Sequence, residues 1–154
     1  CHPPHFLLFT FYFLLSTSPS PPPPPPSCLH PLSSVVVPRA GAEFFQTQAI
    51  YQPEQFKKFM EAVRPFKVKV LAGILLLRNA KMAEFMNANI PGVCVPQDMI
   101  DEMRAAGDKR ALDVGVEIAV RTIKAVRPYC DGVHIMAIKS TERLPEILTK
   151  AELG

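Results

Sequence analysis

The sequence predicts an α/β protein that forms part of a (β/α)8 TIM barrel, about the last three βα units, behind a proline-rich N-terminal segment that does not fold. Three observations predict this. All charged residues and all glycines lie after residue 38. There, short apolar runs alternate with longer amphipathic runs, which is typical of parallel strands connected by helices. The 116 residues at 39–154 hold about three units of roughly 30 residues, whereas a closed barrel needs about 250.

Residues 1–38 differ in composition from the rest of the chain. They contain no charged residue and 11 of the 17 prolines, including six in succession at 21–26. A polyproline run is extended or has no fixed structure. The apolar run at 5–15 is shorter than the roughly 20 residues that span a membrane, and no basic region precedes it as in a signal peptide. We expect residues 1–38 to be unstructured and foreign to the folded domain at 39–154, with a remnant targeting segment or a proline-rich ligand as alternatives.

The first strand and helix are predicted between residues 42 and 65. The run "AEFFQTQAI" at 42–50 is rich in β-formers, although Gln46 and Gln48 are costly to bury unless their amides find partners. For Gln46, a place in a layer inside the barrel and a functional role both remain open. Pro53 suits the first turn of a helix, and Pro65 ends it. Apolar residues recur between the prolines at helical spacing: Phe56, Phe59, Met60 and Val63.

The second strand is predicted at 67–77. Its sequence, "KVKVLAGILLL", alternates at first and then becomes continuously apolar, as a strand covered on both faces does. Asn79 caps the following helix, "NAKMAEFMNAN". A very short strand, "GVCV", is predicted at 92–95. Pro96 then opens a helix that Gly107 ends, because glycine favours the left-handed conformation found after helix C-termini.

The last strand is predicted after a long helix over 108–127. Gly115 lies inside that helix, where glycine costs about 1 kcal/mol relative to alanine, so it indicates close packing against a neighbour. The strand, "DGVHIMAI", covers 131–138, and a final helix covers 145–153. His134 stands alone in this apolar strand, where we expect a hydrogen-bonded core histidine rather than a ligand or a base.

Composition and motifs argue against several classes of protein. A net charge of +3 without a basic run gives no support for nucleic-acid binding. No G-x-G-x-x-G or G-x-x-x-x-G-K-[ST] motif is present, so neither a dinucleotide fingerprint nor a P-loop is predicted. The cysteines form no C-x-x-C pair, and no metal site is expected. Cys94 and Cys130 lie in apolar surroundings, where we expect buried, reduced thiols.

Four segments carry a resemblance to a known family. "FFQTQ", "AGILLL", "IPGVCVP" and "CDGVHIMAI" follow one another in an order and spacing similar to the C-terminal part of methylenetetrahydrofolate reductase, in its bacterial form. The resemblance covers residues 40–154 and none of 1–38. It implies a (β/α)8-barrel flavoprotein that passes a hydride from NAD(P)H through FAD to 5,10-methylenetetrahydrofolate, giving 5-methyltetrahydrofolate for methionine biosynthesis. It also implies a cytoplasmic enzyme with no membrane segment in its folded part, and a homo-oligomer is one expected state of the full-length protein.

The resemblance assigns the substrate contact to the end of the first predicted strand. The Thr-Gln pair of the sixth barrel strand falls on Thr47 and Gln48, and in the family this glutamine contacts the pterin of folate beside the flavin. An amide suits a pterin edge because it presents one acceptor and two donors without charge. Barrel active sites also lie at the C-terminal ends of strands. Tyr51 follows directly and is expected either to flank a flavin or folate ring or to pack in the core.

Two family contacts are altered in this sequence. A glutamine expected after the seventh strand falls near Met82, which cannot form the same hydrogen bonds. An arginine that meets the glutamate tail of folate falls near Ser140, where Lys139 or Arg143 could take its place as a substrate contact. Each of those two cations is equally well explained as a solvated surface charge.

The resemblance assigns no catalytic residue to this chain. In the family, the general acid and most FAD contacts come from the first five barrel units, which this chain lacks. The fragment is therefore expected to bind FAD weakly or not at all and to be inactive alone. The alternative is a folate- or corrinoid-partner binding barrel without redox activity, motivated by Met82 and Ser140. A proline-rich extracellular interaction protein is a third hypothesis, for which the folded part carries no signal.

Overall fold

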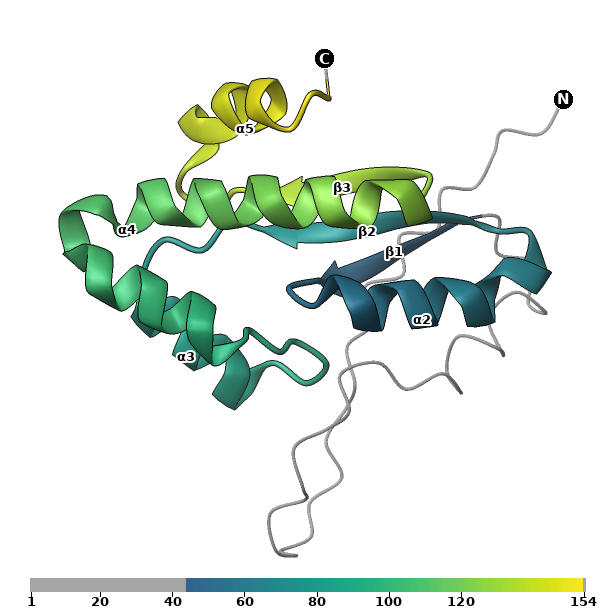
Figure 1. Cartoon of the computed structure of the whole chain (residues 1–154), viewed down its shortest axis with the longest axis horizontal. Helices are drawn as coiled ribbons and strands as arrows, with labels where there is room; N and C mark the ends of the chain where they lie inside the picture. Colours follow the sequence, from purple (N-terminus) through teal and green to yellow (C-terminus); the bar gives the residue numbers. More distant parts are fainter. Residues whose placement is uncertain (1–43, 154) are drawn as a thin grey trace, which may run out of the picture.

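The computed structural model describes residues 44–153, so the expectation for residues 1–38 lies outside the described part. Three parallel strands form one sheet in the order β1 (Phe44–Ala49), β2 (Lys69–Leu75) and β3 (Gly132–Met136) (Figure 1). Each strand runs a few residues shorter than the apolar run that predicted it. The predicted parallel sheet with helical connections is confirmed. This mixed α/β arrangement is compatible with part of an α/β barrel.

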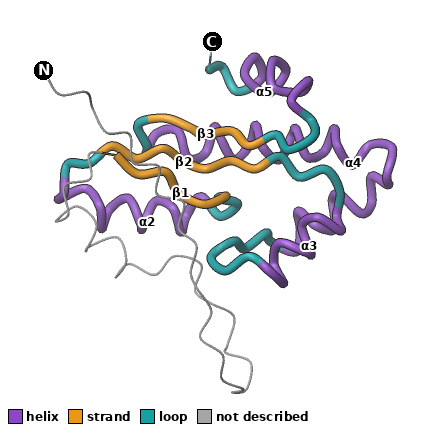
Figure 2. The backbone as a smooth tube through the Cα atoms, turned by 180° about the vertical axis from the view of Figure 1, so that it is seen from behind, coloured by secondary structure: helices purple, strands orange, loops and turns teal. Residues whose placement is uncertain are grey.

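Helices connect and follow the strands. They are α2 (Pro53–Val63), α3 (Ala80–Asn89), α4 (Gln97–Val126) and α5 (Leu144–Lys150), with single 3-10 turns η2 (Arg64–Phe66), η3 (Arg127–Tyr129) and η4 (Thr141–Arg143). The C-terminal half of α4 lies along β2 and β3 on one side of the sheet. From behind, the three strands lie in front of α4, with no helix over them (Figure 2). Within the described residues, none of these helices is both long and apolar enough to cross a membrane.

The helix boundaries follow the predicted stop and start residues. Asn79 caps α3, because its side-chain oxygen accepts a hydrogen bond from the Met82 N–H at 2.8 Å. Gly107 has φ 68° and ψ 168°, which divides α4 into two helices at the predicted position. The final helix ends earlier than expected, at Lys150, because the chain turns there and Glu152 takes a left-handed conformation.

The predicted strand at 92–95 is wrong. This segment is part of a loop between α3 and α4. The Asn87 carboxamide makes both hydrogen bonds that a neighbouring strand would otherwise make with Val95: its Nδ2 donates to the Val95 carbonyl at 2.8 Å, and its Oδ1 accepts from the Val95 N–H at 2.7 Å. A single side chain therefore satisfies this backbone without a sheet partner.

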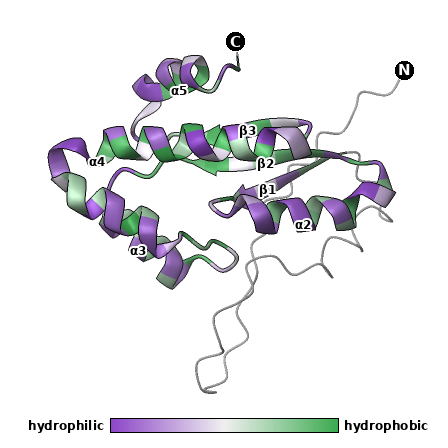
Figure 3. Ribbon diagram, in the orientation of Figure 1, coloured by the Kyte–Doolittle hydropathy of each residue, from purple (hydrophilic) through white to green (hydrophobic). Residues whose placement is uncertain are grey.

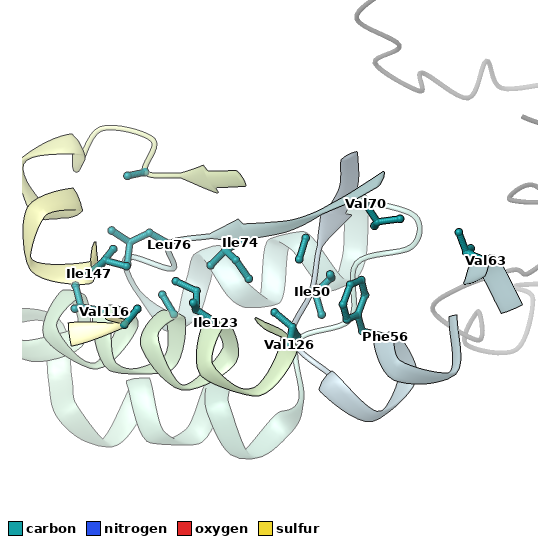
Figure 4. Close-up of a cluster of buried hydrophobic side chains, with 14 residues drawn as sticks. Ile50, Phe56, Val63, Val70, Ile74, Leu76, Val116, Ile123, Val126 and Ile147 are labelled. Atoms are coloured by element: carbon teal, nitrogen blue, oxygen red, sulfur yellow. The ribbon is translucent and has the colours of Figure 1, made fainter. Parts of the chain in front are cut away.

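The main core lies between the sheet and the helices on its covered side. Figure 4 shows side chains from β2, α2, α4 and α5 meeting there. They include Phe56, Val70, Ile74, Leu76, Ile123 and Ile147, all at most 1 % exposed. Hydrophobic residues accordingly predominate along β2 and β3, whereas α2 and α3 carry many hydrophilic residues (Figure 3). Burial of this apolar surface is what holds α2, α4 and α5 against the sheet.

A second core cluster lies beyond the carboxyl ends of β1 and β2. It joins Tyr51 and Leu77 to apolar residues of α3 and α4. Several methionines belong to this cluster: Met86 and Met103 are buried, and Met82 and Met99 are half-buried against it. The cluster fixes α3 near the ends of the strands.

α4 crosses the end of β2 at unusually close range. A Cβ on Gly115 would overlap the Leu77 carbonyl oxygen and lie 3.0 Å from its carbonyl carbon. The prediction that Gly115 marks close packing is therefore confirmed. This crossing also joins the two core clusters, because Val116 packs in the first and Val114 in the second.

Candidate functional site

The candidate site is the carboxyl end of β1, where the strand contains a bulge. Gln46 pairs with Leu71, and Ala49 pairs with Gly73. β1 therefore advances by three residues while β2 advances by two, so one extra residue lies in β1. Bulges of this kind redirect a side chain or end the pairing of a strand, and they are common beside active sites.

Hydrogen bonds from Thr47 hold the bulge together. Its hydroxyl accepts from the Gly73 N–H at 2.9 Å and donates to the Gln48 carbonyl at 2.9 Å. Regular pairing resumes directly afterwards, because the Ile50 N–H donates to the Gly73 carbonyl at 2.9 Å. Glycine is required at residue 73, since the position of a Cβ lies only 2.6 Å from the Gln48 carbonyl oxygen.

The Gln48 side chain lies exposed at this strand end. Its Oε1 is 3.5 Å from the position that a Cβ on Gly92 would occupy, so the amide lies beside the α3–α4 loop. Gly92 has φ 85°, a left-handed conformation that favours glycine. Gln48 and Gly92 line a small hollow of about 30 Å³ together with Gln52, Gln55 and Cys94. The hollow thus has uncharged amides on its rim and a thiol beside them.

Tyr51 forms part of the floor of this hollow. Its ring is 4 % exposed and packs in the second core cluster, and its hydroxyl donates to the Leu75 carbonyl at 3.0 Å. Burial raises the pKa of the Tyr51 hydroxyl well above its ordinary value, so it stays protonated as a donor. Of the two expectations for Tyr51, packing in the core describes its position in this structure.

The residues considered for the folate tail lie elsewhere, after the other edge strand, β3. Ser140 is only 2 % exposed, and Lys139 is exposed with φ 57°. Arg143 is bound by two carboxylates: its guanidinium lies 2.8 Å from both Glu146 and Asp113. These hydrogen bonds, first to Glu146 and then to Asp113, raise the pKa of Arg143. The structure therefore places Gln48 beside the α3–α4 loop, whereas Arg143 lies against the carboxylates of Glu146 and Asp113.

His134 and the two thiols take positions that differ in part from expectation. His134 lies opposite Gly73 on β2 and is half-buried, whereas a core histidine was expected. Cys94 and Cys130 are free thiols as predicted, but each is half-buried rather than buried. Burial is the largest influence on the Cys130 thiol and raises its pKa. Within residues 44–153, no cluster of histidine, cysteine and carboxylate side chains could hold a metal ion.

Two residues at this site did not emerge from the sequence. Gly92 follows Pro91, and a Pro-Gly pair is a turn signal that favours a loop over the strand expected at 92–95. Asn87, which holds that loop, carries no such local signal. Its hydrogen bonds reach a residue eight positions further along the chain, and only the fold brings the two together.

These features define a class of protein. A parallel sheet with helical connections, and an exposed polar side chain at a strand carboxyl end, is the arrangement of α/β enzymes whose sites lie at that end of the sheet. The family model described as methylenetetrahydrofolate reductase matches residues 35–152. The chain therefore belongs to the methylenetetrahydrofolate reductase family, a family of oxidoreductases of one-carbon metabolism, as the resemblance implied. No curated protein matches the chain.

Proposed function

We propose that this chain supplies the folate-facing wall of an FAD-dependent methylenetetrahydrofolate reductase and that Gln48 binds the pterin. The supporting observation is the position of Gln48: its amide is exposed at the carboxyl end of a parallel strand in a chain of this family. Its one acceptor and two donors suit the mixed hydrogen-bonding edge of a pterin. Gly92 places no side chain against the Gln48 amide.

The described residues do not enclose a flavin by themselves. The hollow beside Gln48 has about 30 Å³, roughly the volume of one water, whereas cofactor pockets hold about 300–1,000 Å³. On the same sheet face, Phe44 is 47 % exposed and Gln46 is also exposed, so other parts of a barrel would be needed to cover them. In the family, FAD carries the hydride from NAD(P)H. We propose that this chain alone neither retains FAD nor turns over substrate.

A completed barrel tests the assignment of Gln48. The first five βα units of another family member would be joined ahead of residue 43, and two reactions measured: folate reduction, and NAD(P)H oxidation with an artificial dye. Gln48→Leu removes the amide at nearly constant size. We expect it to lower kcat/KM for folate about 10–100-fold, or about 1.4–2.7 kcal/mol, since an unpaired polar partner costs that much. Dye reduction should be unchanged.

Gln97→Leu provides the matched control, because Gln97 is exposed and donates a hydrogen bond to Asp101 on α4. Both reactions should be unaffected in this variant. Full folate activity in the Gln48→Leu enzyme would refute the assignment of the pterin contact. Separately, flavin that copurifies in stoichiometric amount with the unextended 154-residue chain would refute its proposed inactivity.

A barrel that binds folate or a corrinoid partner without redox chemistry is the second candidate. The observation that favours it is the state of the folate-tail positions: Ser140 is buried, and Arg143 is engaged by Glu146 and Asp113. The completed barrel distinguishes the two candidates. The dye reaction shows that the joined units are active. Given that reaction, folate reduction would favour the reductase, whereas folate binding without reduction would favour the second candidate.

A further inference from the structure

The Thr47 hydroxyl is used almost entirely within the protein. A threonine hydroxyl offers one donor and two acceptor sites. Its donor goes to the Gln48 carbonyl, and one acceptor site takes the Gly73 N–H, both at 2.9 Å. Only one acceptor site is left for a substrate. The side chain is therefore poorly placed to bind folate directly, although it lies next to the residue proposed to do so.

The hydroxyl stands where a strand carbonyl would stand in a regular ladder. In an unbroken parallel pair, the Gly73 N–H would bond to a backbone carbonyl of β1. The bulge turns the carbonyls of Thr47 and Gln48 across the Cα of Gly73, close to where a Cβ would lie. The Thr47 hydroxyl takes the Gly73 N–H instead, and its proton holds the Gln48 carbonyl in the turned orientation.

The Gln48 side chain depends on this orientation. Because Ala49 is held in the core, rotation about the Gln48 Cα–C bond would turn the Gln48 side chain relative to Gly92. The bulge ends one residue later, where Ala49 pairs with Gly73 and is buried. Gln48 therefore turns outward within the bulge, directly before the chain returns to the core at Ala49.

We infer that Thr47 is a positioning residue, whose hydroxyl holds the β1 bulge open and thereby places the Gln48 amide beside Gly92. The consequence for folate rests on the proposed function, but the placement itself does not. Valine has the same shape as threonine and no hydroxyl, so Thr47→Val removes both hydrogen bonds and preserves the packing. Serine retains the hydroxyl, so Thr47→Ser should preserve the placement.

The placement can be measured by NMR on the full 154-residue chain. In the unsubstituted chain we expect slow hydrogen exchange of the Gly73 amide, and a cross-relaxation signal between Gln48 side-chain protons and the Gly92 α-protons. Thr47→Val should speed Gly73 exchange at least tenfold and abolish that signal, and Thr47→Ser should retain both properties. Thr122→Val is the matched control, because Thr122 is buried in α4 and bonds to the Ile118 carbonyl.

The outcomes separate positioning from a general effect on stability. Loss of stability with the Gln48–Gly92 signal intact in Thr47→Val would overturn the inference. Rapid exchange of the Gly73 amide in the unsubstituted chain would overturn it without any variant, so the test survives if Thr47→Val fails to fold. Equal changes at Gly73 in Thr47→Val and Thr122→Val would also overturn it.

The completed barrel separates this inference from the proposed function. If both hold, Thr47→Val lowers kcat/KM for folate about tenfold, leaves dye reduction unchanged, and is rescued by Thr47→Ser. If the NMR result holds but Gln48→Leu retains full folate activity, the proposed function fails and the positioning inference stands. If Gln48→Leu loses folate activity and Thr47→Val does not, the positioning inference fails alone.

Discussion

For the substitution Gly115→Ala, helix propensity and tertiary structure predict changes of opposite sign in the free energy of unfolding. In an isolated helix, alanine is more favourable than glycine by about 1 kcal/mol, so α4 should become more stable. In the folded chain, however, the new methyl group would overlap the Leu77 carbonyl oxygen and lie 3.0 Å from its carbonyl carbon. Both groups are backbone, so no side chain can rotate to make room. The helix or the end of β2 has to move.

The magnitude follows from these two effects. Overpacking in a well-packed core costs about 1–3 kcal/mol, and a contact between backbone groups belongs at the upper end of that range. After the gain of about 1 kcal/mol in propensity, we expect a net loss of about 2 kcal/mol. With a urea m-value of about 1–2 kcal/mol/M, the unfolding midpoint of the full chain should fall by about 1–2 M.

An exposed position in the same helix serves as a reference for the difference in helix propensity between alanine and glycine. Glu117 is exposed two residues further along α4, so the pair Glu117→Ala and Glu117→Gly measures alanine against glycine without a close neighbour. Urea unfolding followed by circular dichroism gives all four stabilities. If Gly115→Ala is as stable as the unsubstituted chain or more so, the close crossing of α4 over β2 is refuted.

Two further predictions concern the α3–α4 loop and the amino ends of the strands. Asn87→Ala removes both hydrogen bonds to Val95 and should speed hydrogen exchange of the Val95 amide by at least about tenfold, since an unsatisfied donor costs about 1–3 kcal/mol. Asn89→Ala on the same helix is the control, and equal exchange in the two variants would contradict a loop held by Asn87. Asp131 accepts from Lys69 at 2.7 Å and from the Val70 N–H at 3.0 Å, which lowers the pKa of its carboxyl. A lowered pKa stabilises the fold above about pH 3.9, and this contribution is lost as the pH falls through the folded-state pKa. Asp131→Asn should therefore lower the free energy of unfolding by about 0.5 kcal/mol at pH 7 and by little below that pKa. A loss of stability that does not depend on pH would refute the ion pair.

The sequence predicted the elements well where local chemistry specifies them. Asn79 caps a helix and Gly107 divides one, because a side-chain oxygen and a left-handed glycine act on their own neighbours. The alternation of apolar and amphipathic runs predicted the parallel sheet, because each run reflects which faces of its own strand or helix are buried. The strand at 92–95 was wrong because short apolar runs suit a strand and a packed loop equally well. The Pro91–Gly92 pair favours a loop, and the distant Asn87 holds that loop in place.

By itself, the sequence determined that this chain is an α/β protein of the methylenetetrahydrofolate reductase family, and that Gln48 lies at the end of a strand. Only the tertiary structure decided how Gln48 is presented. The bulge depends on the Thr47 hydroxyl meeting Gly73, 26 residues away, and the neighbouring loop depends on Asn87. The structure likewise decided that Arg143 pairs with Asp113, 30 positions before it. Local propensity acts over a few residues, whereas these hydrogen bonds join segments that only the packed sheet and helices bring into contact.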